Sequence, residues 1–284
     1  MRKIMLMAVA AACALALMGC GGDGDDNDST STRADEGIWG YTSGADQSGG
    51  QTVAQTVILS DGSFWGIYGY SSVGGTCFQI NDVLQGTASV SGNNASGTYM
   101  DFGTALVTNN TTPINGTYTG TVSAQNNINL TFNNGLTNVP TDMGALANIN
   151  MSYDSIYNQS ASLSSIAGNY QQAVNGCVSA GGPFPIYNLS ISGSNLSLVQ
   201  SYIGSTDVVM TGTITPHGST VNVFDISLTA ASVPATSSGA EWWVIPARTT
   251  YKGILFQTSG ILKNDVELVA TSGNNVLFYL ETKN

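Results

Sequence analysis

Residues 117–133 read TYTGTVSAQNNINLTFN, and this stretch decides the fold. Tyr, Gly and Val alternate with Thr over 117–122, and Ile, Leu and Phe alternate with Asn and Thr over 128–133. A period of two is typical of a strand that buries one of its faces. The polar residues Gln125-Asn126-Asn127 between the two runs favour a turn. The stretch therefore predicts a β-hairpin.

Most of the remaining chain repeats this pattern. An Asp61-Gly62 pair lies between Leu59 and Phe64, which is a strong hairpin signal. A Gly92-Asn93-Asn94 turn separates a second pair of runs. Further strands are expected at 84–90, 95–102, 187–191, 196–198, 208–215, 220–228, 251–257, 265–270 and 276–281.

The pattern breaks at residues 160–168. Leu163, Ile166 and Ala167 fall there on one helical face. Ser160 can cap such a helix and Gly168 can end it. We therefore expect one short helix.

Composition agrees with an all-β fold and excludes some partners. Of 284 residues, 42% are hydrophobic but only 9% are charged, so the surface must consist mainly of Ser, Thr, Asn, Gln and Gly. These residues are poor helix formers. The net charge is −11, and no Lys or Arg lies between Arg33 and Arg248. Without a basic patch, we expect no nucleic-acid partner.

Two parts of the chain look like copies of each other. Residues 37–39, 85–89 and 117–120 match residues 168–170, 211–215 and 250–253 in turn. Each copy yields about eight strands, the number that closes a small antiparallel barrel. We predict an all-β fold of two tandem antiparallel β-barrel modules, 37–154 and 168–284, joined by a short helical connection at 155–167. Chance matching of turn residues and one larger sheet assembly are the alternatives.

The N-terminus carries export signals. Two positive charges, an apolar run and the sequence Leu17-Met18-Gly19-Cys20 are typical of a signal peptide over residues 1–19. The final four residues resemble a bacterial lipobox. The resemblance implies cleavage before Cys20 and acylation of that cysteine, for example by palmitate, and Gly21 after it implies the outer membrane. An ordinary cleaved signal is the alternative.

A tether is expected after the anchor. Residues 20–36 contain six acids and little apolar side chain, a composition typical of disordered segments. A calcium loop is the alternative, but these aspartates do not have EF-hand spacing.

A family resemblance follows from these features taken together. An opening Gly-x-Trp at residues 37–39, followed by hairpins, resembles the lipocalin and calycin barrels. With the lipobox, the acidic tether and two modules, the chain is similar to the tandem-barrel surface lipoproteins typified by transferrin-binding protein B and factor H-binding protein. No partner-binding residue of that family can be placed on this sequence.

Two cysteines remain for pairing in the exported chain. Cys13 leaves with the signal and Cys20 carries lipid, so Cys77 and Cys177 are predicted to form a disulfide between the two copies. Two buried free thiols are the alternative.

The sequence offers little catalytic chemistry. His217, the single histidine, lies in a Pro-His-Gly turn, and no nucleophile motif or zinc ligand set is present. We therefore predict no catalytic residue, no metal and no cofactor. Paired carboxylates are the possible exception. The candidate acids, each expected to be exposed, are Asp101, Asp154, Asp225 and Glu241.

Aromatic residues are the candidate binding residues. Trp242 and Trp243 are adjacent, so in a strand their rings point to opposite faces. Trp65 and Tyr68 lie in a run that is apolar on both faces. Such a strand is either buried between two layers or carries an exposed aromatic site for a glycan or a protein.

Three functions are compatible with these features. The first is a non-enzymatic, lipid-anchored envelope protein of the outer membrane that binds a protein or glycan partner or is a structural component. The second is a calycin-like carrier of a small apolar ligand. The third is a carbohydrate-active enzyme that uses two carboxylates.

Overall fold

The computed structural model describes residues 33–42, 51–71, 78–102, 112–133, 148–172, 186–201, 207–231, 248–259 and 266–283. Residues Thr32–Asn284 form one compact unit. The first eight strands are β1 (Gly37–Thr42), β2 (Gln51–Ile58), β3 (Ser63–Ser71), β4 (Phe78–Ser91), β5 (Asn94–Asp101), β6 (Ile114–Ser123), β7 (Asn127–Phe132) and β8 (Asn148–Asp154). The second eight are β9 (Gly168–Gln172), β10 (Ile186–Ser192), β11 (Asn195–Ser201), β12 (Val208–Pro216), β13 (Val223–Ala230), β14 (Thr250–Phe256), β15 (Val266–Ser272) and β16 (Asn275–Lys283).

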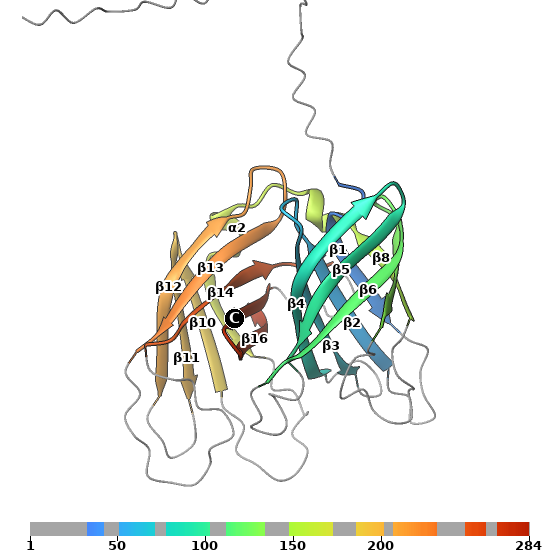
Figure 1. Cartoon of the computed structure of the whole chain (residues 1–284). Helices are drawn as coiled ribbons and strands as arrows, with labels where there is room; N and C mark the ends of the chain where they lie inside the picture. The colour runs from blue at the N-terminus through green and yellow to red at the C-terminus, as the bar shows by residue number, and fades with distance from the viewer. Residues whose placement is uncertain are drawn as a thin grey trace, which may run out of the picture. The chain divides into compact units, whose positions relative to one another are not determined.

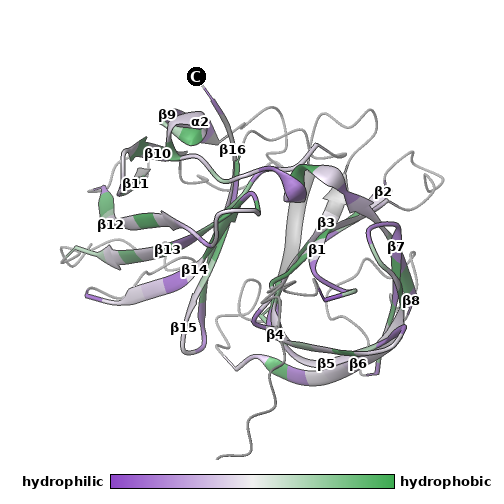
Figure 2. Cartoon of the chain, turned by 90° about the horizontal axis from the view of Figure 1, so that it is seen from above, coloured by the Kyte–Doolittle hydropathy of each residue, from purple (hydrophilic) through white to green (hydrophobic). Residues whose placement is uncertain are grey.

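These strands form two closed antiparallel barrels (Figure 1). Barrel 1 contains β1–β8 in chain order and closes where β1 pairs with β8. Barrel 2 contains β9–β16 and closes where β9 pairs with β16. Figure 2 shows the ring of barrel 1 nearly end-on. The predicted fold class is confirmed, and the architecture is compatible with that of tandem-barrel lipoproteins.

The stretch 117–133 forms the β6–β7 hairpin, as predicted. Tyr118 and Val122 are buried, whereas the threonines beside them are exposed. Ile128, Leu130 and Phe132 are buried on β7. One face of each strand therefore lies inside barrel 1.

The sequence matches between the two copies fall on equivalent strands. They pair β1 with β9, β4 with β12 and β6 with β14, so each match joins strands that occupy the same place in their barrels. Gly86 on β4 and Gly212 on β12 show one physical reason for the match. A Cβ at Gly86 would lie 1.9 Å from the Thr98 carbonyl oxygen, and one at Gly212 would lie 1.7 Å from that of Ser227. Only glycine permits this close approach of neighbouring strands.

Both barrels also begin in the same way. Gly37 and Gly168 open β1 and β9 with φ angles of 156° and 150°, a region that side chains other than glycine rarely adopt. Two residues later, Trp39 Nε1 donates to the Asp35 carbonyl oxygen (3.0 Å) and Tyr170 Oη donates to the Ile166 carbonyl oxygen (2.6 Å). In each barrel, a buried aromatic ring thus fixes the segment that precedes the first strand.

The two closures differ in the side chain that meets this ring. In barrel 1, Tyr153 of β8 contacts Trp39 edge-on, with ring centroids 5.2 Å apart. In barrel 2, the Lys283 ammonium of β16 lies 5.8 Å from the centre of the Tyr170 ring. An aromatic pair therefore closes the first barrel and a cation–π contact closes the second.

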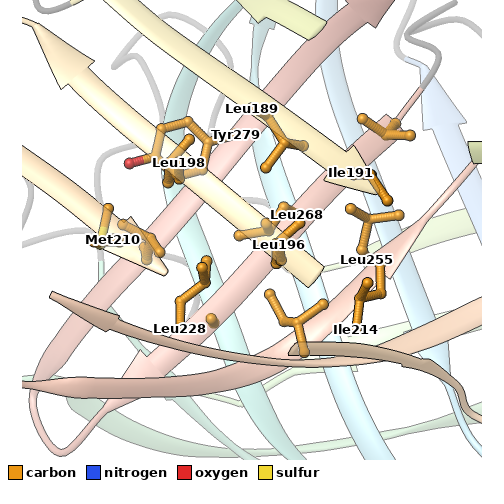
Figure 3. Close-up of a cluster of buried hydrophobic side chains, with 14 of the residues drawn as sticks. Leu189, Ile191, Leu196, Leu198, Met210, Ile214, Leu228, Leu255, Leu268 and Tyr279 are labelled. Atoms are coloured by element: carbon orange, nitrogen blue, oxygen red, sulfur yellow. The ribbon is translucent and has the colours of Figure 1, made fainter. Parts of the chain in front are cut away.

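Side chains fill the interior of each barrel. The interior of barrel 1 includes Trp39, Phe64, Tyr68, Tyr99 and Tyr118. Figure 3 shows part of the corresponding cluster in barrel 2. Its labelled members are Leu189, Ile191, Leu196, Leu198, Met210, Ile214, Leu228, Leu255, Leu268 and Tyr279.

A third apolar cluster joins the barrels, and we call it the seam. Its members from barrel 1 are the outward-facing side chains Val57, Leu59, Trp65, Ile67 and Val83, together with Ile38, Phe102 and Tyr157. Its members from barrel 2 are Val221, Val223, Ile254, Phe256 and Val269. These side chains explain why β2, β3 and β15 are buried on both faces. One face lines a barrel and the other lies in the seam.

Hydroxyl groups lie on the exposed outer surface of each barrel. On barrel 1, Thr87, Thr98 and Thr117 lie side by side across β4, β5 and β6, and the hydroxyls of Thr87 and Thr98 are 2.9 Å apart. On barrel 2, the hydroxyls of Thr229 and Thr250 are also 2.9 Å apart. Neutral side chains thus supply the solvent-facing surface that the low charge content requires.

The connection between the barrels differs from the predicted helix. It contains a 3₁₀ turn, η2 (Ser155–Asn158), and a single helical turn, α2 (Leu163–Ile166). The residue before α2 is Ser162, not Ser160, and its side chain makes no capping hydrogen bond. Gly168 begins β9. Ile166 is the buried residue of α2, and Ala167 directly after it is already extended.

The predicted tether also differs at its end. Asp35 is fully buried and Glu36 is 8% exposed, although both belong to the acidic stretch. Arg33 forms a two-pronged ion pair with Asp35, with nitrogen–oxygen distances of 3.0 and 2.9 Å. Tyr157 donates to Glu36 at 2.8 Å. Each acid therefore has a polar partner that offsets the cost of burial.

Candidate functional site

Polar contacts between the barrels accompany the apolar seam. Asp154, at the end of β8, accepts hydrogen bonds from the backbone nitrogen (2.7 Å) and hydroxyl (2.6 Å) of Ser259. The Thr271 hydroxyl of β15 donates to Gln85 of β4 at 3.0 Å. The bond between Thr271 and Gln85 joins β15 to β4, and both residues line a cleft.

This cleft lies between the barrels and has a volume of about 330 Å³. Barrel 1 supplies Leu59, Asp61, Ser63, Trp65 and Gln85. Barrel 2 supplies His217, Asp225, Ile226, Lys252, Gly253, Ile254 and Thr271. Both barrels are needed to form it, so we treat it as the candidate functional site and call it the seam cleft.

The single histidine lies in the seam cleft. The β12–β13 connection carries His217, whose backbone nitrogen donates to the Val223 carbonyl oxygen at 2.9 Å. Its Nδ1 donates to Asp225 Oδ1 at 2.9 Å. The Asp225 side chain is 52% exposed and that of His217 is 16% exposed. Asp225 therefore keeps free acceptor positions toward solvent while it orients the imidazole.

A second carboxylate comes from barrel 1. Asp61, in the β2–β3 turn, accepts a hydrogen bond from the Ser63 backbone nitrogen at 2.8 Å. Partial burial opposes its ionisation, but the bonds from Ser63 and the charges of His217 and Arg33 outweigh that effect and hold the pKa of Asp61 below its usual value. Asp61 is therefore an ionised hydrogen-bond acceptor at neutral pH.

Lys252 is the cation of the seam cleft. It lies on the outward face of β14, opposite Ser227 on one side and Thr271 on the other. It is exposed and forms no ion pair with another residue in the described part of the chain. The described residues also contain no group of three His, Cys, Asp or Glu side chains that could hold a metal ion.

A second cavity, of about 230 Å³, lies at the closure of barrel 1. Arg33, Glu36, Tyr153, Tyr157 and Asn158 are among its lining residues. Burial and the hydrogen bond to Glu36 raise the pKa of Tyr157 above its ordinary value, so its hydroxyl stays protonated. The polar groups of this cavity largely satisfy one another, and we give it a structural role.

The predicted binding residues have different positions. Tyr68 is 1% exposed and lies in the interior of barrel 1. Trp65 is 8% exposed, belongs to the seam and lines the cleft. Trp242 and Trp243 lie outside the described residues, as do the predicted lipid-bearing Cys20 and the predicted disulfide partners Cys77 and Cys177. Those predictions stay open.

The three candidate acids within the described residues lie in different places. Asp101 is fully buried, contrary to expectation, because the alternation on β5 that turns Tyr99 into barrel 1 also turns Asp101 inward. Asp154 binds Ser259 across the seam. Asp225 alone of the four lines the cleft, and Glu241 lies outside the described residues.

The pairing of His217 with Asp225 was missed from the sequence. The sequence predicts the turn around His217 correctly, but it offers Asp225 only as a candidate member of a carboxylate pair and not as a partner of the histidine. The hairpin register, which sets Thr215 opposite Asp225, carried the missing information.

Comparisons of the chain with protein-family models, curated proteins and solved structures gave no match. In the described part of the chain, no helix is both long and apolar enough to cross a membrane. The function must therefore be inferred from the seam cleft and the sequence.

Proposed function

We propose that the protein is a lipid-anchored, non-enzymatic binding protein of the outer membrane, similar to the tandem-barrel surface lipoproteins, and that it holds its ligand in the seam cleft. The lipobox-like sequence at residues 17–20 supports the anchor. Two or three acyl chains on Cys20 would give a stable membrane attachment, whereas one chain gives only a marginal one.

The observation that carries the proposal is the contrast between the barrel interiors and the seam cleft. Apolar side chains fill both interiors. The cleft is instead open and lined by side chains with free hydrogen-bonding capacity, notably Asp61, Asp225 and Lys252. Binding sites typically combine apolar walls with a few such polar groups. This arrangement favours the cleft over a barrel interior as the ligand site.

The anchor is tested by changing the cysteines of the N-terminal segment one at a time. Cells are labelled with radioactive palmitate and their membranes are separated by density. Cys20→Ser is expected to abolish labelling and to release the protein from the outer-membrane fraction. Cys13→Ser, in the apolar run of the same signal, is the matched control and is expected to keep both. Unchanged labelling and fractionation of Cys20→Ser would refute the anchor.

A further inference from the structure

We propose that the seam cleft binds an uncharged saccharide, a short segment of a neutral glycan. This inference rests on the proposed binding function and names its ligand class. It follows from the charges, the hydrogen-bonding groups, the apolar walls and the size of the cleft.

The charges of the cleft disfavour an ionic ligand of either sign. Asp61 of barrel 1 and Asp225 of barrel 2 both line the cleft and repel an anion. Lys252, which lines the cleft from barrel 2, repels a cation, and it has no ion pair in the described part of the chain that would cancel its charge. A ligand of either single sign therefore meets a like charge in the cleft, which favours an uncharged ligand.

The hydrogen-bonding groups fit hydroxyls. The two carboxylates only accept hydrogen bonds, the Lys252 ammonium only donates, and the Gln85 amide does both. A sugar hydroxyl donates one bond and accepts others, so one ring can satisfy all three kinds of group at once. An apolar ligand would instead leave these groups without their water and unpaired, which is costly.

The walls supply the apolar contact that the C–H face of a sugar ring needs. Leu59 and Trp65 of barrel 1 and Ile254 of barrel 2 line the cleft. The volume of about 330 Å³ lies at the lower end of small-molecule sites, so the cleft admits a short segment of a glycan chain. An open mouth, shown by the half-exposed Asp225, lets a longer chain continue into solvent.

The test uses the whole exported protein carrying Cys20→Ser, purified in soluble form. Isothermal titration calorimetry measures binding of neutral trisaccharides built from glucose, mannose, galactose and N-acetylglucosamine. Trigalacturonate and spermidine are the anionic and cationic comparators. We expect at least one neutral trisaccharide to bind more tightly than either charged comparator.

Two variants test the place of binding. Asp61→Ala removes the acceptor of barrel 1 and Asp225→Ala that of barrel 2, and each is expected to weaken binding about tenfold or more because a charge-assisted hydrogen bond is lost. Asp207→Ala removes an exposed carboxylate that does not line the cleft and is expected to leave affinity unchanged. Thermal unfolding curves of the three variants confirm that each is folded.

Several results would overturn the saccharide inference. They are the absence of binding by every neutral trisaccharide, tighter binding of a charged comparator, and equal affinity in Asp61→Ala, Asp225→Ala and Asp207→Ala. Each of these leaves the anchor result intact, so failure of this inference is distinguishable from failure of the proposed function. Release of new reducing ends from a bound trisaccharide would instead contradict the non-enzymatic proposal.

Discussion

The outward-facing positions of barrel 1 carry apolar side chains on β3 and threonines on β6. On β3, the outward residues Trp65 and Ile67 are apolar and buried in the seam. On β6, the outward residues Thr117, Thr119 and Thr121 are exposed. Both strands line the same barrel interior with their inward-facing side chains. Outward positions therefore record which strands are covered by the second barrel, and inward positions record only the barrel.

The largest expected effect comes from placing a charge on the covered flank. Val57 is fully buried in the seam, so Val57→Asp would bury an unpaired carboxylate. We expect a loss of about 4 kcal/mol or more in the free energy of unfolding, measured by urea denaturation.

Thr119→Asp puts the same side chain on the uncovered flank, where Thr119 is exposed. It is expected to cost about 1 kcal/mol or less. Equal losses in the two variants would show that the seam contributes nothing to stability.

A smaller effect is expected where glycine permits neighbouring strands to approach. Gly86→Ala and Gly212→Ala each push a methyl group against a backbone carbonyl, which cannot rotate away. We expect losses of about 2 to 3 kcal/mol in both barrels. Gly40→Ala on β1 is the control, because a Cβ there has no heavy atom within 4 Å and alanine should be neutral or slightly stabilising. Unequal losses for Gly86 and Gly212 would mean that the two copies differ at this position.

Substitution of the opening glycines, Gly37 and Gly168, should affect the closures of the two barrels differently. A methyl group at Gly37 would meet the rigid Tyr153 ring at 2.5 Å, whereas at Gly168 it would meet the flexible Lys283 chain at 2.7 Å. Both changes incur backbone strain of about 1 to 3 kcal/mol. We expect Gly37→Ala to lower the unfolding temperature more than Gly168→Ala, by differential scanning calorimetry. The reverse order would contradict the assigned closing contacts.

The smallest effect is expected at the cation–π contact. Lys283→Gln keeps the chain length but removes the charge beside Tyr170, and should cost about 0.5 to 1 kcal/mol because Lys283 is exposed. Lys252→Gln, an exposed lysine without such a ring contact among the described residues, is the control for loss of charge. Identical unfolding curves for the two variants would mean that the contact at Tyr170 adds nothing.

Local patterns predicted the fold because the alternation of apolar and polar residues within a strand indicates which of its faces is buried. The alternation at 117–133 and the Asp61-Gly62 turn identify strands and turns without distant information. The same alternation, followed one step further along β5, would have placed Asp101 inside with Tyr99. That error came from treating Asp as a surface residue rather than from a missing signal.

The site was harder to predict because it depends on how one barrel meets the other. The apolar residues on both faces of β3 indicate a covering layer, but nothing local says that β14 and β15 supply it. Asp61 and His217 are far apart in sequence and share the cleft only after both barrels form. Local patterns in a single sequence do not indicate which strands of the two barrels contact each other.

The seam also has a consequence for folding, because barrel 1 can be complete before its apolar flank is covered. Barrel 1 is complete when β8 ends at Asp154, but the residues of barrel 2 that cover its apolar flank begin only at Val221. Until barrel 2 folds, the completed barrel 1 exposes this apolar surface to neighbouring chains. We therefore expect this chain to aggregate more during folding than a single barrel would, and a chaperone that binds incompletely folded chains should reduce that aggregation.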